Sequence, residues 1–362
     1  MELSIDDEVL KAYGFETAKV NLQQIGAGHI NSTYLLSEPN GAQYILQNIN
    51  IQVFKDPNAI ANNINAIAED LKKNHPNYLF PAPIKSITGA LMVHHNDKYW
   101  RLLPYVAHTI ALDTLSDPKQ AYEAAKQFGK LSRLLDQFDP SKLRPTIPGF
   151  HDLSRRYEQF DLALNQGKKE LKALAANEIS IAQHHHFILA YYSSYQHGSK
   201  GAGQDFPDRV MHHDTKISNV LLDETSFQGI CVIDLDTLMP GKFISDLGDM
   251  MRTYLCEFSE NETDLNKIKI RLPYFKATIE GYLSEMAAIL TETEKELILY
   301  AGKYIIYMQG LRFLTDYLNG SIYYPISYLT QNLDRAKNQF KLLRELFENE
   351  KILQSIIEEC LS

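Results

Sequence analysis

The stretch that decides the fold reads His212-His213-Asp214-Thr215-Lys216-Ile217-Ser218-Asn219, and Ile233-Asp234-Leu235-Asp236 follows it along the chain. A short β-rich run ends just before the first segment, and the apolar runs 220–222 and 229–233 precede the second. Because apolar and β-branched residues are typical of strands, we expect the first segment to form a loop between strands. The carboxylate of Asp234 would then emerge at a strand end.

Three polar residues of this stretch have a spacing that indicates phosphoryl transfer. Asp214 and Asn219 lie five positions apart, and Asp234 follows fifteen residues later. In kinase catalytic loops an aspartate meets the acceptor hydroxyl, while an asparagine and a later aspartate hold Mg²⁺ beside the ATP phosphates. Each residue alone fits an ordinary turn, but the three in this order favour function. We predict Asp214 as the base and Asn219 and Asp234 as Mg²⁺ ligands.

A glycine-containing segment, 25–31, precedes the first predicted strand and is a candidate cover for the ATP phosphates. It contains Gly26, Gly28 and Asn31, and glycine allows a backbone to approach phosphate closely, although a simple turn is the alternative. The sequence contains no GxxxxGK[ST] motif, which excludes the ordinary P-loop architecture. The kinase plan also places a lysine on the third strand, where this chain has Gln47. The phosphates must therefore be anchored by a weaker charge or by another residue.

The pattern of elements changes near residues 104–108, where we predict a boundary between two lobes. The first part is rich in strands, with one helix at 60–71 and candidate strands at 32–36, 44–49, 90–93 and 99–103. After the boundary the apolar spacing is helical, at 122–138, 151–175, 179–196, 265–290, 292–318 and 331–361. We therefore expect an α+β protein with lobes 1–104 and 105–362, the second mainly helical.

Composition limits the classes of partner. The chain has 362 residues, 44% of them hydrophobic, with a formal charge of −9 and no Lys/Arg cluster, which argues against a nucleic-acid partner. Its three cysteines form no CxxC pair, and its start lacks the features of a signal peptide. No apolar run is long enough to span a bilayer, for which about 18–20 residues are needed. We expect a cytoplasmic protein that acts on small molecules without a membrane; the oligomeric state is not predicted.

Two further motifs allow competing interpretations. Arg312 and Asp316 lie four apart and hence on one face of a predicted helix, where a surface ion pair is the alternative to a functional role. The run His184-His185-His186 cannot converge on one metal ion, because successive helical side chains fan out by about 100°. The Gly-x-Ser-x-Gly elbow of serine hydrolases is absent.

Over nearly its whole length the sequence resembles the aminoglycoside phosphotransferase and choline kinase superfamily, and within it the N-acetylhexosamine 1-kinases. Besides the catalytic loop, the resemblance rests on segments that are more specific than the generic kinase pattern: 28–34, 44–47, 150–152, 233–241, 246–249 and 312–318. It implies a bilobal protein-kinase-like fold, with an antiparallel sheet in the N-terminal lobe. It also implies an ATP site near the hinge 104–108, to which Tyr105 belongs, and Gln47 recurs in this subgroup.

The same resemblance implies a reaction. ATP and Mg²⁺ would phosphorylate the anomeric hydroxyl of N-acetylglucosamine or N-acetylgalactosamine and give a sugar 1-phosphate. The candidate residues at the sugar are Arg312, Asp316, Tyr323 and His151. Two departures, His213 in place of asparagine and Ser321 in place of aspartate, leave the sugar open. The rival interpretations are the same fold with another acceptor, such as an aminoglycoside, choline, homoserine or another sugar, and a nucleotide-binding scaffold without turnover.

Overall fold

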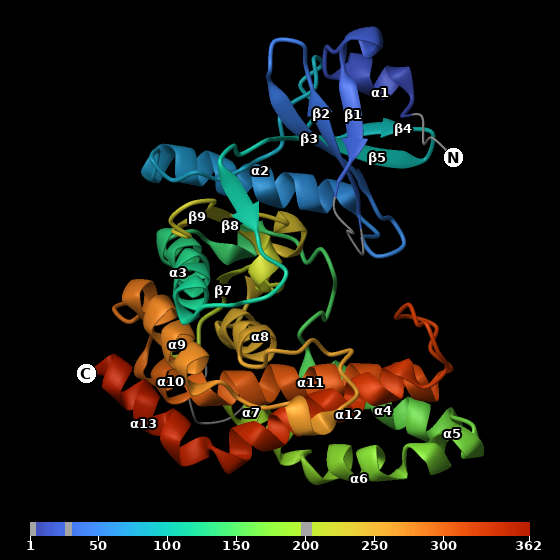
Figure 1. Ribbon diagram of the computed structural model, residues 1–362, viewed down its shortest axis with the longest axis vertical. Coiled ribbons are helices and arrows are strands. Elements are labelled where there is room, and N and C mark those ends of the chain that lie inside the picture. Colours follow the sequence, from blue (N-terminus) through green and yellow to red (C-terminus); the bar gives the residue numbers. More distant parts are fainter. Residues whose placement is uncertain (1–4, 26–30, 197–204) are drawn as a thin grey trace.

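The structure is a computed structural model that describes residues 5–25, 31–196 and 205–362. Figure 1 shows two parts, a small sheet near the N-terminus and a larger, mainly helical part. The sheet has the order β1-β2-β3-β5-β4 and every neighbouring pair is antiparallel. Its strands are β1 (Asn21–Gln24), β2 (Ser32–Ser37), β3 (Gln43–Ile49), β4 (Val93–His95) and β5 (Lys98–Pro104). The helix α1 (Asp7–Ala12) lies beside it, and Leu36, Leu46 and Trp100 belong to its own small core.

Helix α2 (Pro57–Asn74) lies between the sheet and the helical part (Figure 1). It begins where the Asp56 side chain accepts a hydrogen bond from the backbone N–H of Ala59, with proline in the first turn. Its buried face packs into the larger core of the helical part rather than into the core of the sheet. Asn63 extends this contact, because its Nδ2 donates to the backbone oxygens of Arg144 and Leu238, 2.7 and 2.9 Å away. The helix thereby ties the two parts together.

The helical part is built around α11 (Ile298–Leu318), most of whose side chains are buried. Helix α8 (Ile244–Tyr254) packs closely on it: a Cβ atom added at Gly248 would lie 2.3 Å from the backbone oxygen of Ala301. A second close pair is α3 (Pro118–Leu134) and α9 (Leu272–Met286). The remaining helices are α4 (Leu153–Gln166), α5 (Lys169–Leu174), α6 (Ala176–His184), α7 (Phe187–Gln196), α10 (Glu292–Glu296), α12 (Gln331–Glu348) and α13 (Glu350–Leu361).

Short strands frame the loop that contains Asp214. β7 (Arg209–Met211) pairs with β10 (Met239–Gly241), and a three-stranded sheet is formed by β6 (Thr109–Ala111), β8 (Val220–Asp223) and β9 (Gly229–Val232). All of these pairs are antiparallel. The predicted loop lies between β7 and β8, and Asp234 follows the end of β9.

The predicted fold class, α+β with an antiparallel sheet and a mainly helical second part, is confirmed. The strand predicted at 90–93 is wrong except for its last residue: the backbone N–H of Ser86 donates to the Ala90 oxygen in a turn, and β4 starts at Val93. The helix predicted at 122–138 ends at Leu134. The lobe boundary at residue 104 stays a prediction. In the part of the chain that the structure describes, no helix is both long and apolar enough to cross a membrane.

Candidate active site

The loop 212–219 is held by two carboxylates of helix α8. Asp246 accepts the backbone N–H groups of His212 and His213, at 2.9 and 2.7 Å, and Asp249 accepts the backbone N–H of Thr215 at 2.8 Å. Burial raises the pKa of Asp246 to about 7, although both of its backbone hydrogen bonds oppose that shift. The course of the loop is therefore fixed by buried charge-assisted hydrogen bonds.

Asp214 lies in this loop with a cation beside it. The Lys216 Nζ is 3.1 Å from the Asp214 Oδ2. Burial, the largest single effect, raises the pKa of Asp214, but the charge and hydrogen bond of Lys216 together with the charges of His212 and Arg252 lower the pKa overall. The side chain is thus a carboxylate at neutral pH, and a carboxylate can accept a hydrogen bond or a proton from a hydroxyl group.

Hydrogen bonds join Asn219 and the end of β9 to the same loop. The Asn219 Nδ2 donates to the Asp214 backbone oxygen at 2.8 Å, and the Ile233 N–H donates to the Asn219 backbone oxygen at 2.8 Å. The His212 Nε2 is 2.9 Å from the Ile233 backbone oxygen, so the ring of this histidine links the loop to the end of β9. Asp234 follows with φ 58° and ψ 54°, a left-handed conformation that is uncommon outside glycine. The structure therefore brings Asp214, Asn219 and Asp234 together.

Asp234 has the character of a cation ligand. Burial raises its pKa to about 7, and the nearby carboxylates of Asp236 and Asp214 act in the same direction. No hydrogen bond joins its carboxylate to any of the described residues, and the amide oxygen of Asn219 is likewise left open because the Nδ2 makes the contact to Asp214. A divalent cation would offset the repulsion between these carboxylates. Carboxylate and amide oxygens are also the type of ligand that Mg²⁺ prefers.

The number of side-chain ligands bears on how a metal would be held. Within residues 5–25, 31–196 and 205–362, no group of three or more His, Cys, Asp or Glu side chains is arranged to hold a metal ion. In nucleotide sites Mg²⁺ is held by one or two carboxylates together with phosphate oxygens and water. The donor set fits Mg²⁺ bound together with a nucleotide.

Asn31 and Gln47, both predicted to meet ATP, belong to a network that crosses from the sheet to the catalytic region. The Asn31 Nδ2 donates to the Asp236 Oδ2 at 2.7 Å. The Gln47 Oε1 accepts from the Arg101 Nε at 2.9 Å and from its Nη2 at 2.7 Å. The Arg101 Nη1 in turn forms a buried ion pair with Asp236. Asp236 lies two residues after Asp234, so the network ends beside the candidate metal ligand.

The structure gives less information on the other residues predicted at the nucleotide. Gly26 and Gly28 lie outside the described residues, so their part in phosphate binding stays a prediction. Tyr105 directly follows β5 and is 39% exposed, at the connection between the sheet and the helical part. An exposed aromatic ring at this connection could still cover an adenine ring.

The predicted sugar residue His151 lies on the other side of the catalytic loop. Its ring centroid is 5.4 Å from the ring of His213, the neighbour of Asp214, and 4.6 Å from the stacked ring of Phe150. Burial, followed by the charges of His213 and Arg312, holds its pKa well below the ordinary value, so the ring is neutral. Its Nδ1 is buried and has no hydrogen-bond partner among the described residues. A buried nitrogen without a partner is uncommon in proteins, and this one lies in a ring that neighbours His213 of the catalytic loop.

Two arginines complete this face of the site. The Arg312 guanidinium lies 5.2 Å above the ring of Phe150 and 5.6 Å above that of Tyr324. The Arg156 Nη2 donates to the Phe150 backbone oxygen at 3.0 Å, and its buried Nε has no partner among the described residues. Burial and then the charge of Arg312 lower the pKa of Arg156 to about 10. We call Phe150, His151, Arg156, Arg312 and Tyr324 the acceptor cluster.

Asp316 holds a segment beside this cluster. Its carboxylate is 5% exposed and accepts the backbone N–H groups of residues 322, 323 and 324 at 2.9–3.0 Å, and the Asn332 Nδ2 at 2.9 Å. Arg312 and Asp316 form no ion pair with each other; the Arg312 Nη1 donates instead to Gln309. The alternative of an ion pair between these two side chains on the helix surface is therefore wrong. Tyr323 belongs to the segment that Asp316 holds and is 60% exposed.

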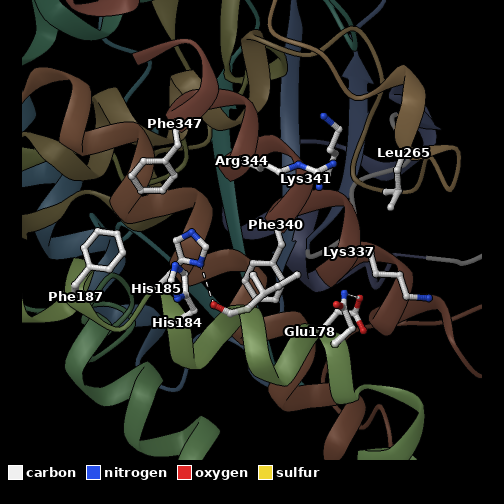
Figure 2. A pocket seen from close by; sticks show the side chains of 12 residues that line it. Glu178, His184, His185, Phe187, Leu265, Lys337, Phe340, Lys341, Arg344 and Phe347 are labelled. Carbon is white, nitrogen blue, oxygen red and sulfur yellow. Dashed lines mark hydrogen bonds between the residues drawn. The ribbon is translucent and has the colours of Figure 1, made fainter. Parts of the chain in front are cut away.

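A pocket of about 450 Å³ lies away from these residues, between α6 and α12 (Figure 2). It is lined by Glu178, aromatic rings such as Phe340, and cations such as Lys337 and Lys341. Lys337 is paired with Asp334 and Lys341 with Glu345, each on the same helix. None of the residues predicted to act on ATP or sugar lines this pocket, so the candidate active site remains at the loop 212–219.

Sequence reasoning missed several residues of the site. Lys216, Asp236 and the α8 carboxylates appear in the quoted motifs, but no role was derived for them. Arg101 was not singled out, although a charged residue between Trp100 and Leu102 in an apolar strand is a recognisable signal for a buried cation. Arg156 carries no such signal, because the charged residues of α4 are otherwise exposed and Arg156 follows one of them, Arg155, directly.

Comparisons with known proteins agree with this geometry. Residues 21–272 match the model of the phosphotransferase enzyme family (APH). The fold is similar to an amicoumacin kinase in complex with AMP-PNP and Ca²⁺, with 13% identity, a TM-score of 0.58 and coverage of 97% of this chain and 92% of that one. A spectinomycin phosphotransferase in complex with ADP is 18% identical, with a TM-score of 0.55 and coverage of 98% of this chain and 97% of that one. A choline kinase from Cryptosporidium parvum is 14% identical, with a TM-score of 0.56 and coverage of 98% of both chains.

These structural similarities are at low identity and support the fold. The family match is broader evidence, because it covers more than half of the chain and includes the loop 212–219, Asp234 and the α8 carboxylates. The chain belongs to the APH phosphotransferase enzyme family and is a phosphotransferase with a kinase-like fold.

Proposed function

We propose that the protein transfers the γ-phosphoryl group of ATP to the anomeric hydroxyl of an N-acetylhexosamine. The sugar would be N-acetylglucosamine or N-acetylgalactosamine. The observation that carries this proposal is the position of Asp214. Hydrogen bonds link its loop to Asn219 and to the residue before Asp234, and His213 joins it to the ring of His151 in the acceptor cluster. A carboxylate between a cation site and an acceptor site is suited to phosphoryl transfer.

In the proposed reaction Asp214 accepts a hydrogen bond from the sugar O1 hydroxyl and takes its proton as O1 bonds to the γ-phosphorus. The bond between that phosphorus and the bridging oxygen of ATP breaks, and ADP leaves. Asn219 and Asp234 would hold Mg²⁺, which supplies neutralisation of phosphate charge when it is bound with ATP. Lys216 keeps Asp214 ionised and limits its movement through the 3.1 Å contact. Most of the rate gain comes from positioning, because phosphoryl transfer needs little covalent chemistry from the protein.

The charge of the acceptor cluster supports an uncharged acceptor. Neither Arg156 nor Arg312 forms an ion pair with a carboxylate among the described residues; Arg312 lies over two aromatic rings, and Arg156 donates to the Phe150 backbone oxygen. Guanidinium N–H groups and a free histidine nitrogen suit hydroxyl and acyl oxygens, and aromatic faces suit a sugar ring. A choline or aminoglycoside cation would meet like charge here. This favours an N-acetylated sugar over those rival acceptors.

The direct test is incubation of the protein with MgATP and a panel of sugars, aminoglycosides, homoserine and choline, followed by ³¹P NMR. We expect a new anomeric phosphate signal with N-acetylglucosamine or N-acetylgalactosamine. A phosphate ester at C6, or phosphorylation of only the non-sugar acceptors, would contradict the proposal. Nucleotide binding without consumption across the whole panel would favour the scaffold interpretation.

Removal of the Asp234 carboxylate is expected to uncouple nucleotide binding from Mg²⁺. The native protein should bind ADP at least about tenfold more tightly with Mg²⁺ than with EDTA, a difference of about 1.4 kcal/mol. In Asp234→Asn this difference should disappear, because a main cation ligand is lost. Glu224→Gln, at an exposed position in the β8–β9 turn, should keep it. Titration calorimetry measures both affinities, and an unchanged Mg²⁺ effect in Asp234→Asn would remove this residue from the metal site.

A further inference from the structure

We propose that Arg101 is the cation that anchors the nucleotide phosphates, in the role that the kinase plan gives to a lysine at the position of Gln47. The inference rests on the nucleotide site of the proposed function and assigns a residue that this function left open. It concerns phosphate binding alone and is independent of the acceptor.

Strand register places Arg101 beside the missing lysine. In the antiparallel pair of β3 and β5, Gln47 is directly opposite Arg101, and opposite residues project from the same face of a sheet. Two hydrogen bonds from the guanidinium to the Gln47 Oε1, at 2.9 and 2.7 Å, confirm that the side chains meet. The positive charge is therefore displaced by one strand and stays on the same face.

The guanidinium also points toward the catalytic region, where its Nη1 pairs with Asp236. Asp236 follows Asp234 by two residues and also accepts a hydrogen bond from Asn31, so the guanidinium lies at the point where the sheet meets the catalytic region. Phosphate groups bound between the sheet and Asp234 would lie within the field of this cation. Among the described residues, Arg101 is the cation that the sheet contributes to this network.

The hydrogen bonds of Arg101 leave donors for a ligand. A guanidinium has five N–H groups, and the contacts with Gln47 and Asp236 account for three of them. One N–H on each terminal nitrogen remains, in a buried side chain that is 2% exposed and held in one orientation. Paired N–H groups on a planar cation match phosphate oxygens, and preorganisation lowers the entropy lost on binding.

The glutamate partner used in the kinase plan is replaced as well. Glu69 of α2 is exposed and accepts a hydrogen bond from Asn65 of the same helix, with no contact to Gln47 or Arg101. Asp236 from the helical part takes its place as the counter-charge. A purely structural link between the two parts would use the same ion pair, so the test must separate phosphate binding from general integrity.

Comparison of adenosine and ADP makes that separation, because only ADP carries phosphates. In Arg101→Gln we expect adenosine to bind as in the native protein and MgADP to bind at least about tenfold more weakly, by titration calorimetry. The control Lys98→Gln removes an exposed cation from the same strand and should change neither affinity. An equal loss of affinity for adenosine and MgADP would mean that Arg101 only links the two parts of the structure. Unchanged MgADP affinity would also overturn the proposal.

A second variant keeps the test valid if Arg101→Gln does not fold. Gln47→Lys combined with Arg101→Gln returns a cation to the neighbouring strand, and we expect MgADP affinity within about tenfold of the native value. A folded double variant that binds adenosine but not MgADP would contradict the proposal. Failure of the proposed function is recognised separately, because it is read from the absence of a sugar phosphate with the native protein, whereas the test of Arg101 compares the binding of adenosine and of MgADP.

Discussion

Replacement of Asp214 by asparagine is expected to lower turnover by about 10²–10⁴-fold, the usual contribution of a general base. The amide can still hydrogen-bond a hydroxyl, but it cannot take the proton that leaves as the bond to phosphorus forms. The affinity for MgADP should change little, since Asn219 and Asp234 remain. Steady-state kinetics with N-acetylglucosamine and calorimetry with MgADP measure the two effects.

A matched control is Asp208→Asn, which alters an exposed carboxylate just before β7. It also loses a salt bridge, to Lys242, so it reproduces the loss of charge and of an ion pair without touching the loop. We expect its turnover to remain near the native value, because exposed ion pairs contribute little. Near-normal turnover in Asp214→Asn would rule out Asp214 as the base.

Replacement of Arg209 by methionine is expected to lower the free energy of unfolding by about 3–5 kcal/mol, the cost of breaking a buried ion pair from one side. Arg209 starts β7, the strand that leads into the catalytic loop. Its Nε and Nη2 donate to both oxygens of Glu294 at 2.9 Å, and its Nη1 donates to Asp136 at 2.5 Å. The Glu294 side chain is 0% exposed, so the substitution leaves an unpaired charge in the core. Urea denaturation measures the loss.

The double variant Arg209→Met with Glu294→Gln tests the cause of this loss. It removes the unpaired charge as well as the cation, while Asp136 keeps contact with solvent at 25% exposure. We therefore expect the double variant to be more stable than Arg209→Met alone. If the double variant were less stable than the single one, desolvated charge would not be the main source of the loss.

The fold could be predicted largely because periodicity and catalytic spacing agree in this chain. The residues 60–71 and 298–318 have the apolar spacing of helices that pack into a common core, and both regions form helices. Helix α8 was not predicted, although it holds the catalytic loop. Its carboxylates Asp246 and Asp249 are buried rather than solvated, so the polar positions of this helix do not mark a surface face.

The candidate site could be predicted where a role follows from one chain segment. Asp214, Asn219 and Asp234 are close in sequence, and their order alone indicates their chemistry. Arg101 and Asp236 could not be paired in this way, because they are 135 residues apart and their contact depends on how the sheet sits on the helical part. Long-range pairs of this kind are determined by tertiary packing, which local patterns do not encode.

The way in which Asp316 holds residues 322–324 has a consequence for the redesign of this protein. One carboxylate gathers three consecutive backbone N–H groups, and a backbone N–H is the same whichever side chain follows it. The outward positions Ile322 and Tyr323, 82% and 60% exposed, can thus be exchanged while the path of the chain is kept. Under the proposed function, Ile322 and Tyr323 are therefore positions at which acceptor preference could be altered while the loop 212–219 is left unchanged.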